Sequence, residues 1–239
     1  MRIAYFDCVA GASGDMLLGA LIDAGASLAV LRENIATLQL SGCDLHVEQV
    51  MRGALAARRV TVVTPQPETE RHVKDLVAVI DQAGLPEVVK ERSRATLLRI
   101  AQAEAHIHQH PVEEIHLHEL GGDDTLIDIV GVVSALESLE ITKVFVSPLP
   151  LSLGFVHCMH GLIPLPAPAT LALLEGAPVR YVDNANAELV TPTGAALLTA
   201  LADGFGGFPP MQLKKVGVGA GYHQLDFPNI LRVWIGETQ

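Results

Sequence analysis

Short apolar runs alternate with longer helical patterns along most of this sequence, and few fold classes accommodate that order. The first 25 residues indicate a strand at 2–6, a glycine-rich turn at 10–15 and an apolar helix at 16–24 that ends at Gly25. Such alternation favours an α/β fold with layered mixed sheets and flanking helices. We predict further helices at 28–38, 73–83, 87–106, 125–139, 169–174 and 193–205, and further strands at 45–50, 60–63, 143–147, 212–218 and 230–235.

Prolines punctuate the middle of the chain, and an extended stretch at 148–168 separates two groups of predicted elements. We therefore expect two α/β lobes, residues 1–147 and residues 148–239. One continuous domain stays open as the alternative, because the composition does not shift sharply at this boundary.

Composition narrows the class of protein further. Hydrophobic residues make up 49% of the 239 residues and charged residues 18%, which is typical of a globular chain. The formal net charge of −11 argues against nucleic-acid binding, which needs clustered Lys and Arg. No run of 18 uncharged apolar residues is present, so we expect no membrane-spanning helix.

The N-terminus and the cysteines predict a cytoplasmic location. Asp7 interrupts the sequence before the apolar core of a signal peptide can form. Cys8, Cys43 and Cys158 have no CxxC spacing and cannot all pair, so we expect reduced thiols rather than a disulfide framework.

The segment from 106 to 128 contains the strongest candidate for a metal site. His116 and His118 are two residues apart, a spacing that places both rings on one face of an extended strand. Glu119 ends this strand, and Asp124 and Asp128 lie one turn apart at the start of the next helix. Nitrogen and carboxylate donors that converge in this way can share one divalent ion. The alternative is that the carboxylates only complement the helix dipole.

The turn AGASGD offers backbone N–H groups between a strand and a helix. It contains Gly11, Ser13 and Gly14, and Asp7 and Asp15 flank it. Such a turn can cradle an anion, although it lacks the lysine of a P-loop and the spacing of a dinucleotide-binding turn. Because the two aspartates would repel a phosphate, a bridging cation would be needed. A purely steric use of glycine is the alternative.

Two further segments carry polar side chains at helix or strand ends. In TPTGAA, Thr191, Thr193 and Gly194 open a helix, where anion binding competes with ordinary N-capping. In the segment 152–161, His157 and His160 are three residues apart with a cysteine between them. These two histidines are either two metal ligands or one ligand and one packing residue.

Taken together, these segments resemble the LarC family of nickel insertion proteins. The matching stretches are YFDCVAGASGDMLLGALIDAG, EEIHLHELGGDDTLIDIVG, PLPLSLGFV, HGLIPLPAPAT, ELVTPTGAA and FPNILRV. They occur in the order that the family shows, across nearly the whole chain.

The resemblance implies insertion of nickel into pyridinium-3,5-bisthiocarboxylic acid mononucleotide, which yields the nickel-pincer nucleotide cofactor of lactate racemase and related enzymes. In the full-length family this reaction consumes CTP with Mg or Mn, and CTP binding is associated with a C-terminal domain that this chain does not include. We expect that domain or subunit as a partner, with a homo-oligomer as a further expectation, and neither nucleic acid nor membrane.

Within that function we expect the candidate residues to take three roles. Asp7, Ser13 and Asp15 would be catalytic, and nickel would bind at the HxHE segment and the helix that follows it. The metal ligands would be His116, His118, Glu119, Asp124 and Asp128, and the cofactor would contact Gly11, Gly14, Thr191, Thr193 and Gly194.

Two local departures from the family pattern affect the ligand set. The loop PQPETERHVKDL contains only His72, where family members commonly carry a run of histidines. Gly122 and Asp123 replace the usual Ala-Val before the aspartate. Two alternative functions stay open: a nickel carrier without catalysis, and a phosphohydrolase that binds magnesium through Asp7, Asp15, Asp124 and Asp128.

Overall fold

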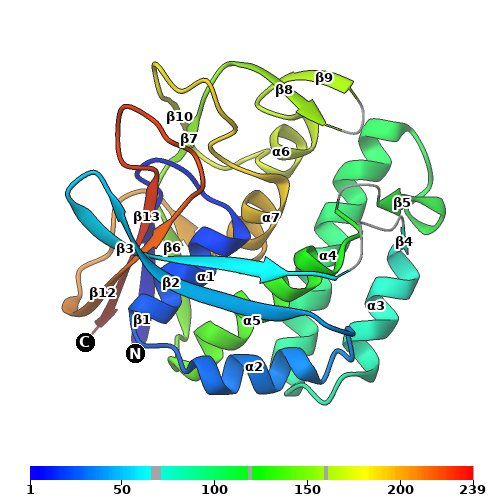
Figure 1. The fold of residues 1–239 in the computed structure, drawn as a ribbon, viewed down its shortest axis with the longest axis horizontal. Coiled ribbons are helices and arrows are strands. Elements are labelled where there is room, and N and C mark those ends of the chain that lie inside the picture. Colours follow the sequence, from blue (N-terminus) through cyan, green and yellow to red (C-terminus); the bar gives the residue numbers. More distant parts are fainter. Residues whose placement is uncertain (66–70, 118–119, 159–160, 239) are drawn as a thin grey trace.

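The computed structural model describes residues 1–65, 71–117, 120–158 and 161–238, and its main element is a seven-stranded mixed sheet (Figure 1). The strand order is β11-β6-β1-β13-β12-β3-β2. Parallel pairs join β1 to β6, β6 to β11 and β12 to β3, and antiparallel pairs join the others. The strands are β1 (Arg2–Asp7), β2 (Asp44–Arg52), β3 (Leu55–Val63), β6 (Lys143–Val146), β11 (Gly204–Phe205), β12 (Gln212–Ala220) and β13 (Ile230–Glu237).

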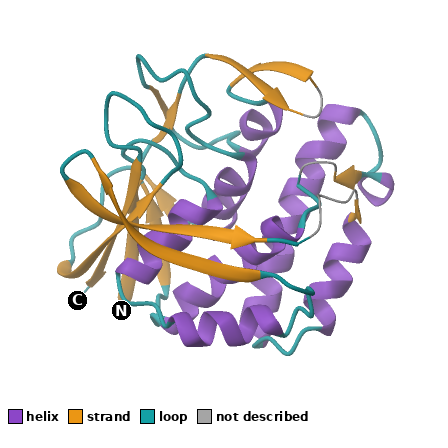
Figure 2. Ribbon diagram, viewed as in Figure 1, coloured by secondary structure: helices purple, strands orange, loops and turns teal. Residues whose placement is uncertain are grey.

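Helices gather on one side of this sheet, as Figure 2 shows. Helix α1 packs against the strands, and α5 packs against α1 in turn. Both helices bury residues around most of their circumference, which suits a position inside the core. The helices are α1 (Gly14–Asp23), α2 (Leu28–Ala36), α3 (Val73–Gln82), α4 (Glu87–His108), α5 (Asp123–Ser138), α6 (Pro168–Leu173) and α7 (Pro192–Leu201), with a 3-10 turn at Val112–Glu114.

Three small sheets lie outside the main one. Strand β4 (Arg71–His72) pairs antiparallel with β5 (His116–Leu117), and β7 (Leu149–Leu151) pairs parallel with β10 (Val179–Tyr181). The hairpin of β8 (Gly154–Cys158) and β9 (Gly161–Leu165) lies near α6 (Figure 1). These strands are short: β4 and β5 have two residues each, and the others have three to five.

The predicted α/β class is confirmed, and most predicted elements are present with shifted ends. One boundary was wrong: the helix expected at 193–205 ends at Leu201, and Phe205 lies in β11 beside β6. The main sheet takes strands from both sides of the boundary expected at 147/148. Among the described residues, no helix is long and apolar enough to cross a membrane.

Candidate functional site

Two neighbouring cavities lie where the glycine turn, α5, the start of α7 and the β8–β9 hairpin come together. The larger has a volume of about 530 Å³ and is called here the large cavity. The smaller has a volume of about 270 Å³, and we call it the acidic cavity because Asp15, Asp124 and Asp128 line it. Glu188 and Thr191 line both cavities, so the two adjoin.

The carboxylates of the acidic cavity come from two different helices. Asp15 lies in the first turn of α1, and Asp124 and Asp128 lie one turn apart in α5. Ser13 donates a short hydrogen bond to Oδ1 of Asp15. The Oδ2 of Asp15 and the Oδ1 of Asp128 are shielded from solvent and have no hydrogen-bond partner. Buried polar atoms are nearly always partnered, so two such oxygens in one cavity point to a missing ligand or proton.

Burial and mutual repulsion raise the pKa of these carboxyl groups. Burial raises the pKa of Asp128 well above its ordinary value, and the charges of Asp15 and Asp124 add to the effect. Burial also raises the pKa of Asp15, although the hydrogen bond from Ser13 and the nearby His223 oppose it. The pKa of Asp124 is raised chiefly by burial. These carboxyl groups therefore hold their protons to a higher pH than ordinary aspartates do, and a bound cation would favour their ionised form.

Glycine at position 14 permits the close approach between α1 and α5 that forms this cavity. A Cβ atom there would lie 2.2 Å from Oδ2 of Asp128. At Gly194 a Cβ atom would lie 2.3 Å from the carbonyl oxygen of Ala12, and at Gly11 it would lie 2.8 Å from that of Leu189. The structure thus supplies a steric reason for all three glycines, and their predicted contact with a cofactor stays a prediction.

The threonines of TPTGAA lie at the junction of the two cavities. Thr191 is the N-cap of α7, and its hydroxyl accepts a hydrogen bond of 3.2 Å from the backbone N–H of Gly194. It also lines both cavities, while Thr193 lines only the large one. N-capping at this segment is therefore present, and it leaves the threonines next to the space where a ligand would bind.

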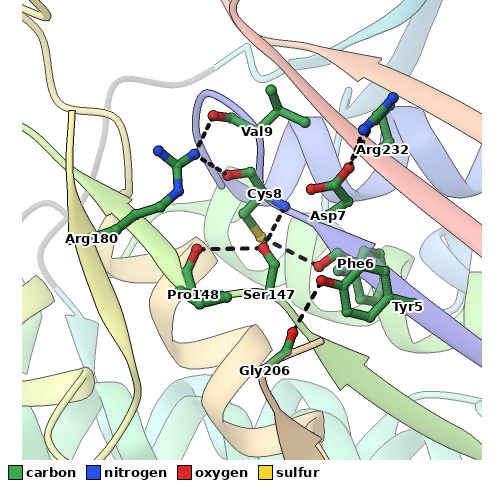
Figure 3. A network of polar contacts seen from close by, with 10 residues as sticks. All are labelled: Tyr5, Phe6, Asp7, Cys8, Val9, Ser147, Pro148, Arg180, Gly206 and Arg232. Carbon is green, nitrogen blue, oxygen red and sulfur yellow. Dashed lines mark hydrogen bonds and ion pairs between the residues drawn. The ribbon is translucent and has the colours of Figure 1, made fainter. Parts of the chain in front are cut away.

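Asp7, by contrast, is not among the residues that line either cavity. It ends β1 and forms an ion pair with Arg232 of β13, with Nε and Oδ2 2.9 Å apart (Figure 3). Next to it, the backbone N–H of Cys8 donates to Oγ of Ser147 at 2.9 Å, and Arg180 donates to the carbonyl oxygen of Cys8 at 3.2 Å. These contacts hold the backbone at the entry to the glycine turn, and the predicted catalytic role of Asp7 stays a prediction.

The HxHE segment is only partly described. His116 lies in β5 directly opposite His72 of β4, with ring centroids 3.8 Å apart. It lines neither of the two cavities, and its predicted role as a metal ligand stays a prediction. His118 and Glu119 lie outside the described residues. The next residue, Leu120, lines the large cavity.

The large cavity combines an apolar wall with nitrogen, sulfur and carboxylate donors. Ile107, Val156 and Ile163 contribute to the wall. The polar donors are Glu104, His108, His157, Cys158 and Glu188. His108 lies 3.3 Å from Glu104 one turn away on α4, measured from Nε2 to Oε2. Within the described ranges, no three His, Cys, Asp or Glu side chains form a group that could hold a metal ion by themselves.

Comparison with known proteins decides the family. The family model described as nickel insertion protein matches residues 4–239. The chain belongs to the nickel insertion protein family. Two proteins of Desulfitobacterium hafniense named pyridinium-3,5-bisthiocarboxylic acid mononucleotide nickel insertion protein, from strains DCB-2 and Y51, are each 44% identical to it over 237 residues.

These alignments cover 99% of this chain but 59% of each relative. The chain thus spans about three fifths of the length of the curated relatives that it matches. No solved structure matches it.

Sequence reasoning in this member of the nickel insertion family singled out His157 and the neighbouring Cys158, which line the large cavity, but not Glu104 or Glu188. His108, near the end of α4, also lines this cavity. The spacing of Glu104 and His108, four residues apart on one helix face, was the available signal. Glu188 and His223 carried no local signal, because only the tertiary fold brings them to the site. His160 lies outside the described residues.

Proposed function

We propose that the chain inserts nickel into pyridinium-3,5-bisthiocarboxylic acid mononucleotide, and that the large cavity is where nickel meets this organic ligand. The observation that carries the proposal is the mixture of nitrogen, sulfur and carboxylate donors on the apolar wall of a cavity of about 530 Å³. That volume lies within the range typical of small-molecule sites, about 300–1,000 Å³. Membership of the nickel insertion family and the names of the two Desulfitobacterium hafniense relatives support the same substrate.

The donor types suit a metal that is passed on rather than kept. Imidazole and thiolate bind nickel well, and a carboxylate adds charge without locking the ion in place. His108 and Cys158 line the cavity from two different elements, so nickel held between them stays open to a third donor. The sulfur atoms of the organic ligand then outcompete a small number of protein donors.

The remaining parts of the proposal concern the whole protein. The product would be the nickel-pincer nucleotide used by lactate racemase-type enzymes in the cytoplasm. CTP, with Mg or Mn, would bind to the part of the relatives that lies beyond this chain, as a C-terminal domain or a separate subunit. A homo-oligomer is compatible with this arrangement. The alternative to the large cavity is the nickel site predicted at His116, His118, Glu119, Asp124 and Asp128, which stays a prediction.

A calorimetric titration of the chain with Ni²⁺ tests the proposed site. We expect His108→Ala and Cys158→Ser each to lower nickel affinity by about tenfold or more, because each removes one donor. His46→Ala is the matched control, since His46 is exposed on β2 and lines neither cavity. Nickel affinity unchanged in both cavity variants would contradict the assignment.

Transfer is tested separately, by adding the thiolated mononucleotide to the nickel-loaded chain and following the nickel–sulfur absorption. We expect the absorption to grow with wild type and to fall sharply with the two cavity variants. Because CTP is expected to act elsewhere, the same assay is repeated with a full-length relative. Tight nickel binding with no transfer in either protein would favour the carrier function instead.

A further inference from the structure

We propose that the acidic cavity binds a second divalent cation, a hard ion such as Mg²⁺, through the carboxylates of Asp15 and Asp128 and separately from nickel. The role of this ion rests on the proposed function: it would hold the phosphate of the mononucleotide. The cation site itself is argued from the cavity alone.

The first argument is the pair of unpartnered oxygens. The Oδ2 of Asp15 and the Oδ1 of Asp128 belong to side chains on different helices, and both side chains line the same cavity. The close approach at Gly14, one residue before Asp15, places the first turn of α1 against Asp128. Two shielded carboxylate oxygens without hydrogen bonds are costly to maintain, and a cation between them would satisfy both.

The second argument is the absence of a permanent counter-charge. Among the described residues that line the acidic cavity there is no Lys or Arg, and His223 is the basic side chain. Elsewhere the fold does pair its carboxylates: Asp7, Asp23, Glu48, Asp81 and Asp123 each form an ion pair with an arginine. A buried group of aspartates without such a partner is the arrangement that a transient cation would neutralise.

The third argument is the donor chemistry. The donors of this cavity are mainly oxygen atoms: beside the carboxylates stand the hydroxyl groups of Ser13, Thr191 and Tyr222. Oxygen donors suit Mg²⁺ or Mn²⁺, whereas the imidazole and thiol groups of the large cavity suit nickel. Magnesium usually binds through one or two carboxylates, several waters and a substrate phosphate, so it does not need a cage of three protein ligands.

The position of the cavity explains why such an ion would be useful. Thr191 and Glu188 line both cavities, so a ligand in the large cavity reaches the edge of the acidic one. A phosphate at that edge would be repelled by three aspartates unless a cation stood between them. The ion would thus convert a repulsive wall into a binding site for a phosphate monoester.

Binding of Mn²⁺, a paramagnetic substitute for Mg²⁺, tests the proposal without nickel or mononucleotide. We expect electron paramagnetic resonance to show one bound Mn²⁺ per chain, displaced by excess Mg²⁺. Asp15→Asn and Asp128→Asn should each weaken binding by about tenfold or more. Asp226→Asn is the control, because Asp226 is exposed and lines neither of the two cavities. Circular dichroism checks that each variant is folded. Because the two substitutions lie on different helices, the test still stands if one of the variants fails to fold.

Three results would overturn the proposal: no Mn²⁺ bound by the wild-type chain, equal binding by wild type and both variants, or complete displacement of Mn²⁺ by one equivalent of nickel. The last result would mean that both ions share one site. Failure of nickel transfer with Mn²⁺ binding intact would instead contradict the proposed function and leave the cation site standing.

Discussion

Replacement of Gly194 by alanine tests how tightly the start of α7 packs on the glycine turn. The new Cβ would lie 2.3 Å from the carbonyl oxygen of Ala12, 2.6 Å from its carbonyl carbon and 2.8 Å from Cα of Ser13. All three are backbone atoms, so no side chain can rotate away. The backbone around Ala12 is also held by hydrogen bonds of 2.8 Å to Leu189 and 3.1 Å from Thr191.

The cost follows from that geometry. Forcing the two segments apart is an overpacking defect of about 1–3 kcal/mol, and losing one of the two hydrogen bonds adds about 1 kcal/mol. Against this, alanine in place of glycine favours the helix by up to about 1 kcal/mol. We therefore expect Gly194→Ala to lower the free energy of unfolding by about 1–3 kcal/mol. In a chain of this length each kcal/mol lowers Tm by roughly 2–4 °C.

Urea unfolding followed by circular dichroism measures the difference. The matched control is Gly207→Ala, because a Cβ atom at Gly207 would meet nothing within 4 Å. If Gly194→Ala is as stable as Gly207→Ala, the two segments are not in contact as the structure shows, and the steric account of this glycine fails.

Three further predictions concern Asp128, Cys8 and the pair of Asp7 and Arg232. Burial raises the pKa of Asp128. With divalent cations removed by a chelator, the folded chain keeps a proton on Asp128 that the unfolded chain loses above a pH of about 4. The free energy of unfolding therefore falls as the pH rises from that value toward the raised pKa. Urea titrations should show the advantage of Asp128→Asn over wild type growing with pH, and an advantage independent of pH would contradict this. Burial raises the pKa of Cys8 to about 12, so mass spectrometry should find Cys8 unlabelled by iodoacetamide in the folded chain and labelled in urea; equal labelling rates would refute its burial. A double-mutant cycle with Arg232→Ala and Asp7→Asn should give a coupling of about 0.5–1 kcal/mol in urea unfolding, and no coupling would show that the pair does not form in solution.

Local chemistry was enough to predict most of the helices. The backbone N–H of Val30 donates to Ser27, which caps α2 as its side chain predicts, and Pro168 begins α6, where its missing N–H costs little. The short strands of the three small sheets could not be predicted, because two to five residues carry no periodic signal. The helix predicted at 193–205 was too long, because Phe205 continues the apolar pattern of that helix but pairs with Val146 of β6.

The candidate site also has a part that the sequence predicts and a part that it does not. Sequence alone determined which residues near the glycine turn and at the start of α5 could do chemistry. It also determined the family, because the order of the motifs along the chain is visible without knowing how they pack. Only the tertiary structure decided which of them meet. Asp15 and Asp128 converge because α1 packs on α5, whereas Asp7 is ion-paired with Arg232 on β13. His108 and Glu188 share a cavity although 80 positions apart in the sequence. Such contacts depend on the packing of whole elements, which no local pattern of residues specifies.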